Sequence, residues 1–82
     1  MRIRYFAALR EAAGCGEEEL GLPASILTGH ELVRWLARER PELAPALASP
    51  SLRIALDREV ASFAAPLKGV REIALFPPMT GG

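Results

Sequence analysis

The residues with the most distinctive chemistry form the run Pro77-Pro78-Met79-Thr80-Gly81-Gly82, where the 82-residue sequence ends. Proline fixes φ near −65° and donates no backbone N–H, so the preceding strand-like segment is expected to end at Phe76. Glycine has no Cβ, so Gly81 and Gly82 can pass through narrow spaces that other residues cannot enter. We therefore expect a domain at 1–76 and an extended, flexible C-terminal tail at 77–82.

The chemistry available to such a tail is that of a terminal carboxylate. An α-carboxyl group has a pKa of about 3.3 to 3.7, so the Gly82 carboxylate would be ionised at neutral pH and would be a poor electrophile. A partner enzyme could activate it by letting it attack the α-phosphorus of ATP, and a sulfur donor could convert the acyl-adenylate into a thiocarboxylate. The simpler interpretation is a frayed, inert chain end.

Other candidate reactive groups are sparse. His30 is the sole histidine and is expected in the first turn of a helix, and a metal site needs several converging ligands, so we expect no metal. Cys15 is the sole cysteine, has no recognisable base beside it, and is expected to be a spectator thiol in a reducing cytosol. The acidic run 17–19 reads as a solvated strand edge. No phosphate-binding glycine loop or Ser/His/Asp set is present, so any catalysis is expected to come from partners.

Charge and hydropathy exclude several classes of function. Ten basic and ten acidic residues give a formal net charge of zero, which argues against non-specific binding to nucleic acid or anionic membranes. No apolar run approaches the roughly 20 residues of a membrane span, and the start of the chain lacks the apolar stretch of a signal peptide. We expect a single-domain cytoplasmic protein.

Residue patterns predict the elements of this domain. Alternating apolar residues predict strands at 2–7, 17–22, 52–56, 60–63 and 71–76, and helix formers predict helices at 8–13, 28–40 and 42–47. Thr28 and Glu31 have the spacing of a capping box at the start of the long helix. This order indicates an α+β domain in which one main helix, with short helical segments, covers a mixed sheet of four to five strands.

Two aromatic residues are expected on the side of the sheet that faces away from the core. In the first strand Ile3, Tyr5 and Ala7 are predicted to point inward and Phe6 outward, and Phe76 is predicted to point outward from the last strand. If these two strands lie side by side, Phe6 and Phe76 form an exposed apolar patch at the root of the tail. We interpret this patch as a candidate partner surface.

Two segments resemble a known family. Phe6-Ala7 with Arg10-Glu11 and Gly14, and above all the ending from Ala74 to Gly82, resemble the small, sulfur-carrying subunit of molybdopterin synthase, a ubiquitin-like protein. The resemblance covers essentially the full length and implies the β-grasp fold. One departure is visible: where the family has a Gly-Asp-Glu turn before the last strand, this chain reads Gly69-Val70-Arg71-Glu72.

The resemblance implies a role in molybdenum cofactor biosynthesis. Gly82 would be adenylated with ATP by an enzyme of the ubiquitin-activating type and then converted to a thiocarboxylate by a sulfur donor. The tail, residues 77–82, would enter the large subunit of molybdopterin synthase and donate sulfur to cyclic pyranopterin monophosphate. Two small and two large subunits would form a heterotetramer with the active site on the large one. This chain would then be a non-catalytic subunit with no bound cofactor.

Three other functions remain open at this point. A sulfur carrier of thiamine biosynthesis or another pathway would share the fold and the terminal Gly-Gly. A ubiquitin-like modifier would join Gly82 to lysines of target proteins. A plain binding module would have an inert tail.

Overall fold

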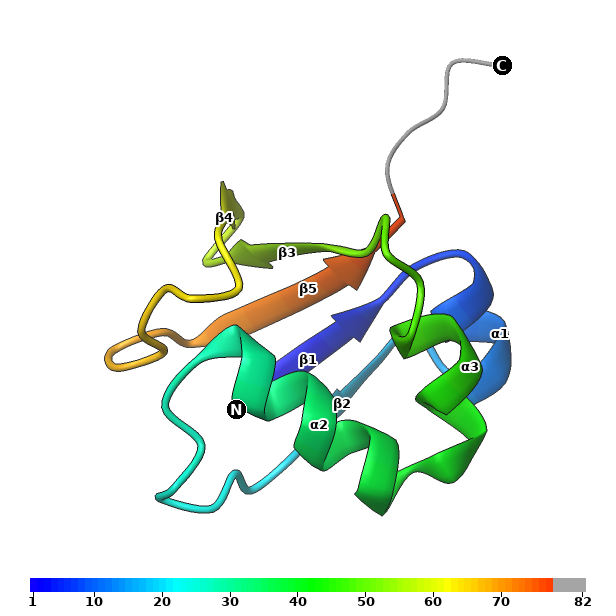
Figure 1. Cartoon of the computed structure of the whole chain (residues 1–82), viewed down its shortest axis with the longest axis horizontal. Helices are drawn as coiled ribbons and strands as arrows, with labels where there is room; N and C mark the ends of the chain where they lie inside the picture. The colour runs from blue at the N-terminus through cyan, green and yellow to red at the C-terminus, as the bar shows by residue number, and fades with distance from the viewer. Residues whose placement is uncertain (78–82) are drawn as a thin grey trace.

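The computed structural model describes residues 1–77, and its elements follow the predicted order (Figure 1). The strands are β1 (Arg2–Tyr5), β2 (Glu17–Glu19), β3 (Arg53–Leu56), β4 (Glu59–Ala61) and β5 (Glu72–Phe76). The helices are α1 (Ala8–Ala13), α2 (Gly29–Glu39), the 3-10 turn η1 (Pro41–Leu43) and α3 (Ala44–Leu47). The main helix, the short helical segments and the last strand are confirmed close to their predicted bounds.

The strands form one mixed sheet in the order β2-β1-β5-β3-β4. The central pair, β1 and β5, is parallel, and the other pairs are antiparallel. The predicted α+β class with a mixed sheet is therefore confirmed. Because β1 and β5 run the same way, they end at the same edge of the sheet, and Figure 1 shows the end of β5 beside the turn that leads from β1 into α1.

Helix α2 covers one face of this sheet and supplies much of the core (Figure 1). Thr28 caps its first turn by accepting a hydrogen bond from the backbone N–H of Glu31, as the capping box predicts. Leu32 and Leu36, one helical turn apart, are fully buried. They pack in one cluster with the inward side chains of the central strands, Ile3, Tyr5, Ile54, Ile73 and Leu75. The opposite face of the sheet carries the outward residues of the strands.

The first strand is shorter than predicted. It ends at Tyr5, and Ala7 is exposed with φ 53°, so the prediction that Ala7 points into the core is wrong. The physical reason is the start of α1 at Ala8, which requires the chain to turn sharply after β1. Helix α1 ends at Ala13 as predicted, and the next residue, Gly14, has a φ of 76°, the left-handed conformation that favours glycine in this position.

Two weaker strands also differ from prediction. β2 stops at Glu19 rather than Leu22, and it pairs antiparallel with β1, with Arg4 in register with Glu17. β4 spans Glu59–Ala61 instead of 60–63. Short edge strands of this kind carry few ladder hydrogen bonds, so alternation over two or three residues does not determine where they end.

Two turns are joined by one carboxylate. Asp57 Oδ1 accepts hydrogen bonds from the backbone N–H groups of Arg71 and Glu72, at 3.0 and 2.9 Å. Gly69 in the approach to β5 has φ 81°. The turn that departs from the family pattern is therefore anchored by Asp57, from the β3–β4 connection, whose side chain satisfies the donors at the start of β5.

Candidate functional site

Phe6 and Phe76 lie side by side at the edge where β1 and β5 end. Tyr5 is in register with Leu75, so the residue that follows each of them emerges at the same level. The two rings meet edge to face, with their centroids 6.5 Å apart and their planes at 85°, an arrangement favoured by the aromatic quadrupole. Phe6 is 37% exposed. The predicted apolar patch is confirmed as a structural feature; its role as a partner surface stays a prediction.

A shallow hollow surrounds these rings. Its lining consists of apolar side chains with charged residues at the border: Arg4, Phe6, Ala7, Arg58, Glu72, Ala74, Phe76 and Pro77. The Arg4 guanidinium lies 5.2 Å from the centre of the Phe6 ring, within the range of a cation–π contact. The surface is thus suited to receive an apolar side chain of another protein and to contact polar groups around it. We refer to these eight residues as the Phe6–Phe76 surface.

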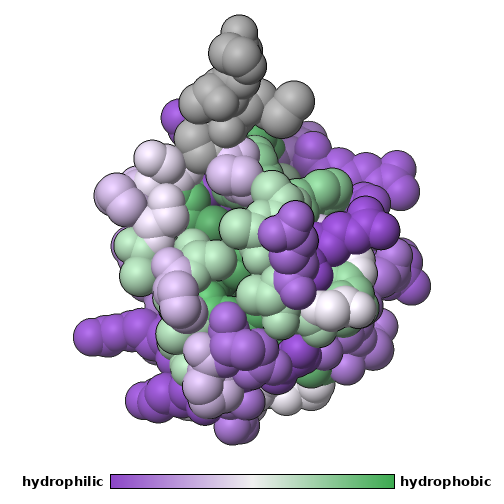
Figure 2. Space-filling view, turned by 90° about the vertical axis from the view of Figure 1, so that its right-hand side faces the viewer, coloured by the Kyte–Doolittle hydropathy of each residue, from purple (hydrophilic) through white to green (hydrophobic). Residues whose placement is uncertain are grey.

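The apolar character continues on the neighbouring side of the molecule. Figure 2 looks onto the side where α1 and α3 lie and shows hydrophobic residues gathered in the middle of this face, with hydrophilic residues around them. Leu9 of α1 and Leu47 of α3 are buried beneath, and much of what remains at the surface of these helices is alanine. An exposed apolar area of this kind is suited to contact with a partner protein.

Pro77 is exposed and directly follows β5, at the border of the Phe6–Phe76 surface. The other predicted tail residues, Pro78, Met79, Thr80, Gly81 and Gly82, lie outside the described part of the chain. The predicted tail therefore begins at the patch, and its reactive end stays a prediction.

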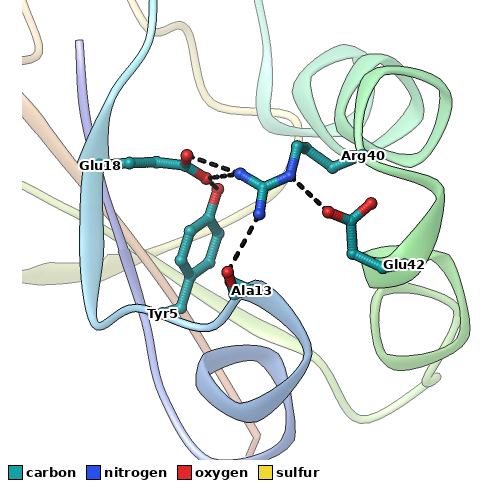
Figure 3. Close-up of polar contacts among 5 residues, drawn as sticks. All are labelled: Tyr5, Ala13, Glu18, Arg40 and Glu42. Carbon is teal, nitrogen blue, oxygen red and sulfur yellow. Dashed lines mark hydrogen bonds and ion pairs between the residues drawn. The ribbon is translucent and has the colours of Figure 1, made fainter.

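A second cluster of charged side chains links the helices to the sheet (Figure 3). Arg40, at the C-terminal end of α2, donates through Nη1 to the Glu18 carboxylate at 2.6 Å and through Nε to Glu42 at 2.7 Å. Its Nη2 donates to the carbonyl of Ala13 at 3.1 Å. Glu18 also accepts a hydrogen bond from the Tyr5 hydroxyl at 2.5 Å. One guanidinium thus connects β2, the end of α1 and η1.

This cluster is structural, because its groups satisfy one another. Among the residues that the structure describes, no buried side-chain nitrogen or oxygen lacks a partner. The Arg40 hydrogen bond holds the pKa of the Glu42 carboxyl below its usual value.

The prediction of a solvated edge is wrong for Glu18, which is half-buried because its side chain points toward Tyr5 and Arg40. Glu17 and Glu19 are exposed as predicted.

The Tyr5 hydroxyl provides a test of this cluster. Burial, together with the hydrogen bond to Glu18, raises its pKa well above the ordinary value near 10. As pH rises through about 10 the unfolded chain loses this proton first, so the free energy of unfolding falls. We expect Tyr5→Phe to lower the free energy of unfolding by about 1 to 2 kcal/mol near neutral pH, the value of a hydrogen bond to a charged group. Above about pH 10 the difference in this free energy between the parent chain and the variant should become smaller.

Urea unfolding at about pH 8 and about pH 11 measures this effect. Tyr5 is the sole tyrosine, so the parent chain and the variant differ in no other group that titrates in this range. A difference that stays constant or widens at high pH would show that Tyr5 is not held in its protonated form by the fold.

The other candidate reactive residues named from the sequence, His30 and Cys15, do not form a common site in the structure. His30 is exposed, and its ring lies 5.8 Å from that of Phe63. Cys15 is half-buried and packs against the core. Within residues 1–77 no group of three or more His, Cys, Asp or Glu side chains could hold a metal ion, and no helix is long and apolar enough to cross a membrane.

Three arginines of this area were not predicted from the sequence: Arg4 and Arg58 of the Phe6–Phe76 surface, and Arg53 opposite Phe76. Arg4 shares a strand face with Phe6, so its place was readable from the alternation. Arg53 and Arg58 come close only through the pairing of β3 with β5 and through the turn after β3. No local signal in the sequence indicates that pairing.

Comparison with known proteins agrees with this geometry. The family model described as the ThiS family matches residues 3–82. The "Molybdopterin synthase sulfur carrier subunit" of Escherichia coli (strain K12) is 33% identical over 82 residues, which cover 100% of this chain and 99% of that protein. Among solved structures, SAMP1 from Haloferax volcanii has a TM-score of 0.77 at 23% identity, covering 99% of this chain and 97% of that one. A putative molybdopterin converting factor, subunit 1, from Pyrococcus furiosus has a TM-score of 0.73 at 23% identity, covering 95% of each chain. These likenesses confirm the predicted ubiquitin-like β-grasp fold.

Proposed function

Because this chain belongs to the ThiS family, we propose that it is a sulfur carrier whose Gly82 bears the transferred sulfur as a thiocarboxylate. The observation that carries the proposal is the alignment with the E. coli sulfur carrier subunit, which is 33% identical and includes the whole chain up to Gly82. The place of Pro77, at the end of β5 and beside an apolar surface, supports it. A tail that begins there would enter a partner while the Phe6–Phe76 surface docks on it.

The proposed chemistry takes place in the sites of other proteins. In the adenylating enzyme the Gly82 carboxylate attacks the α-phosphorus of ATP, pyrophosphate leaves, and an acyl-adenylate forms. Hydrosulfide supplied by the donor then attacks the acyl carbon and displaces AMP, which leaves the thiocarboxylate and releases a proton. In this proposal the fold contributes a stable body, and the tail that follows Pro77 carries the reactive carboxylate.

The pathway that we propose is molybdenum cofactor biosynthesis. The large subunit of molybdopterin synthase would receive the loaded tail, and cyclic pyranopterin monophosphate would accept the sulfur. The name of the E. coli relative supports this choice over thiamine biosynthesis. We place two copies of this chain and two large subunits in the assembly, with the active site on the large subunits.

Intact-mass measurement tests the proposal. The chain is incubated with the adenylating enzyme, ATP and a sulfur source, and its mass is expected to rise by the difference between a sulfur and an oxygen atom. Addition of the large subunit and cyclic pyranopterin monophosphate should return the mass to its starting value as molybdopterin forms. An unchanged mass contradicts the carrier function, and conjugates with other proteins support the modifier instead. A loaded chain that supplies only a thiamine precursor contradicts the pathway.

A further inference from the structure

The outward face of the sheet is arranged in rows that the strand register defines. One row runs Arg4, Ala74, Ala55 and Val60 across the four strands β1, β5, β3 and β4. The next row, toward the end of β5, places Arg53 opposite Phe76, with Phe6 beside it. Residues paired in this way point to the same face of a sheet. Arginine therefore stands on both sides of the aromatic pair.

A third arginine reaches this area from the turn between β3 and β4. Asp57 and Arg58 both have left-handed backbones, with φ 48° and 73°, as a tight turn joining two antiparallel strands requires. The Arg58 side chain is 85% exposed, borders the hollow and lies with Nε 4.0 Å from the Glu72 carboxylate. The hydrogen bonds of Asp57 to the start of β5 hold this turn in place.

Charge is distributed unevenly along this face. At the end away from the aromatic pair, Arg2 is paired with Glu17 at 3.3 Å and the amino terminus with Glu19 at 3.0 Å. Among the residues that line the hollow, two arginines, Arg4 and Arg58, accompany one carboxylate, Glu72, and Arg53 stands opposite Phe76 at the border. Arg4 and Arg58 share that carboxylate, at 3.9 and 4.0 Å. A chain with no net charge thus presents a locally positive border around an apolar centre.

We propose that the protein docking on the Phe6–Phe76 surface presents an apolar side chain bordered by carboxylates that meet Arg4, Arg53 and Arg58. This inference rests on the proposed function in one respect, that a partner protein docks on the Phe6–Phe76 surface. The apolar centre matches the fully buried core of a protein interface, and the positive border requires an acidic rim opposite it. A partner with a basic rim would be repelled, so this border discriminates among partners and steers association.

Charge reversal at the border tests the proposal. The affinity of the intact chain for the purified large subunit of molybdopterin synthase, and for the adenylating enzyme, is measured at low and high salt. Arg53→Glu and Arg58→Glu are each expected to weaken binding about tenfold at low salt. The matched control is Arg38→Glu, which makes the same charge change on the exposed side of α2. Arg58→Gln removes the charge with less disturbance of the turn and is expected to show a smaller loss in the same direction.

The outcomes separate this inference from the proposed function. Supporting results are a loss confined to the border variants and an affinity of the parent chain that falls as salt rises. Equal affinities for Arg53→Glu, Arg58→Glu and Arg38→Glu, with melting curves that show folded proteins, overturn the inference while thiocarboxylate formation by mass still upholds the carrier. If the parent chain binds neither protein, the inference and the proposed docking fail together.

Discussion

Deletion of Gly82, or addition of an alanine after it, is expected to abolish the gain of sulfur mass on incubation with the adenylating enzyme, ATP and a sulfur source. The proposed chemistry requires the terminal carboxylate at a fixed distance from the docking surface, and both variants change that distance. The added alanine also places a methyl group in a passage that suits glycine. A displacement of about 1 Å can cost two orders of magnitude in rate. A change of a whole residue, about 3.5 Å of extended chain, should therefore leave no detectable product.

The same variants should fold like the parent chain. Among the described residues the buried core runs from Ile3 to Leu75, and Gly82 has no side chain to add to it. The matched control is Gly21→Ala, which changes a glycine whose Cβ would meet nothing within 4 Å. We expect this variant to gain sulfur normally. A truncated chain that gains sulfur at the rate of the parent would refute the assignment of the reactive group to Gly82.

The elements that sequence predicted well are those that short-range chemistry determines. The end of α1 follows from Gly14, and the start of α2 from the reciprocal spacing of Thr28 and Glu31. The inward and outward residues of β1 and β5 follow from strict alternation. The alternation in β1 and β5 was enough to predict the pair of Phe6 and Phe76, once the two strands are taken to be neighbours.

The parts that sequence missed depend on contacts between distant residues. Glu18 was read as solvated because its partner Arg40 lies 22 residues further along the chain. The anchoring of β5 depends on Asp57, 14 residues before Arg71. A carboxylate in an acidic run and one that binds two backbone N–H groups look alike in sequence, because the difference lies in which donors the fold brings to them.

Phe6→Ala is expected to weaken binding to the large synthase subunit about 30-fold or more. An aromatic side chain at the centre of an interface contributes about 2 kcal/mol or more when truncated, which corresponds to this factor. The variant also removes the ring against which Phe76 packs and over which Arg4 lies. Isothermal titration of the intact chain with the large subunit measures the loss. The variant should stay folded, because Phe6 lies outside the cluster of buried core residues, and thermal unfolding checks this.

A second exposed apolar residue provides the control for Phe6. Leu27 is 62% exposed in the segment before α2, away from the end of β5, so Leu27→Ala should bind like the parent. Salt distinguishes the aromatic contribution from that of the arginines, because burial of apolar surface is not screened. The loss caused by Phe6→Ala should therefore persist at high salt, where the losses caused by the arginine variants fade. Unchanged binding of Phe6→Ala would mean that the partner docks elsewhere on the domain, and the apolar face over α1 and α3 would then be the next surface to mutate.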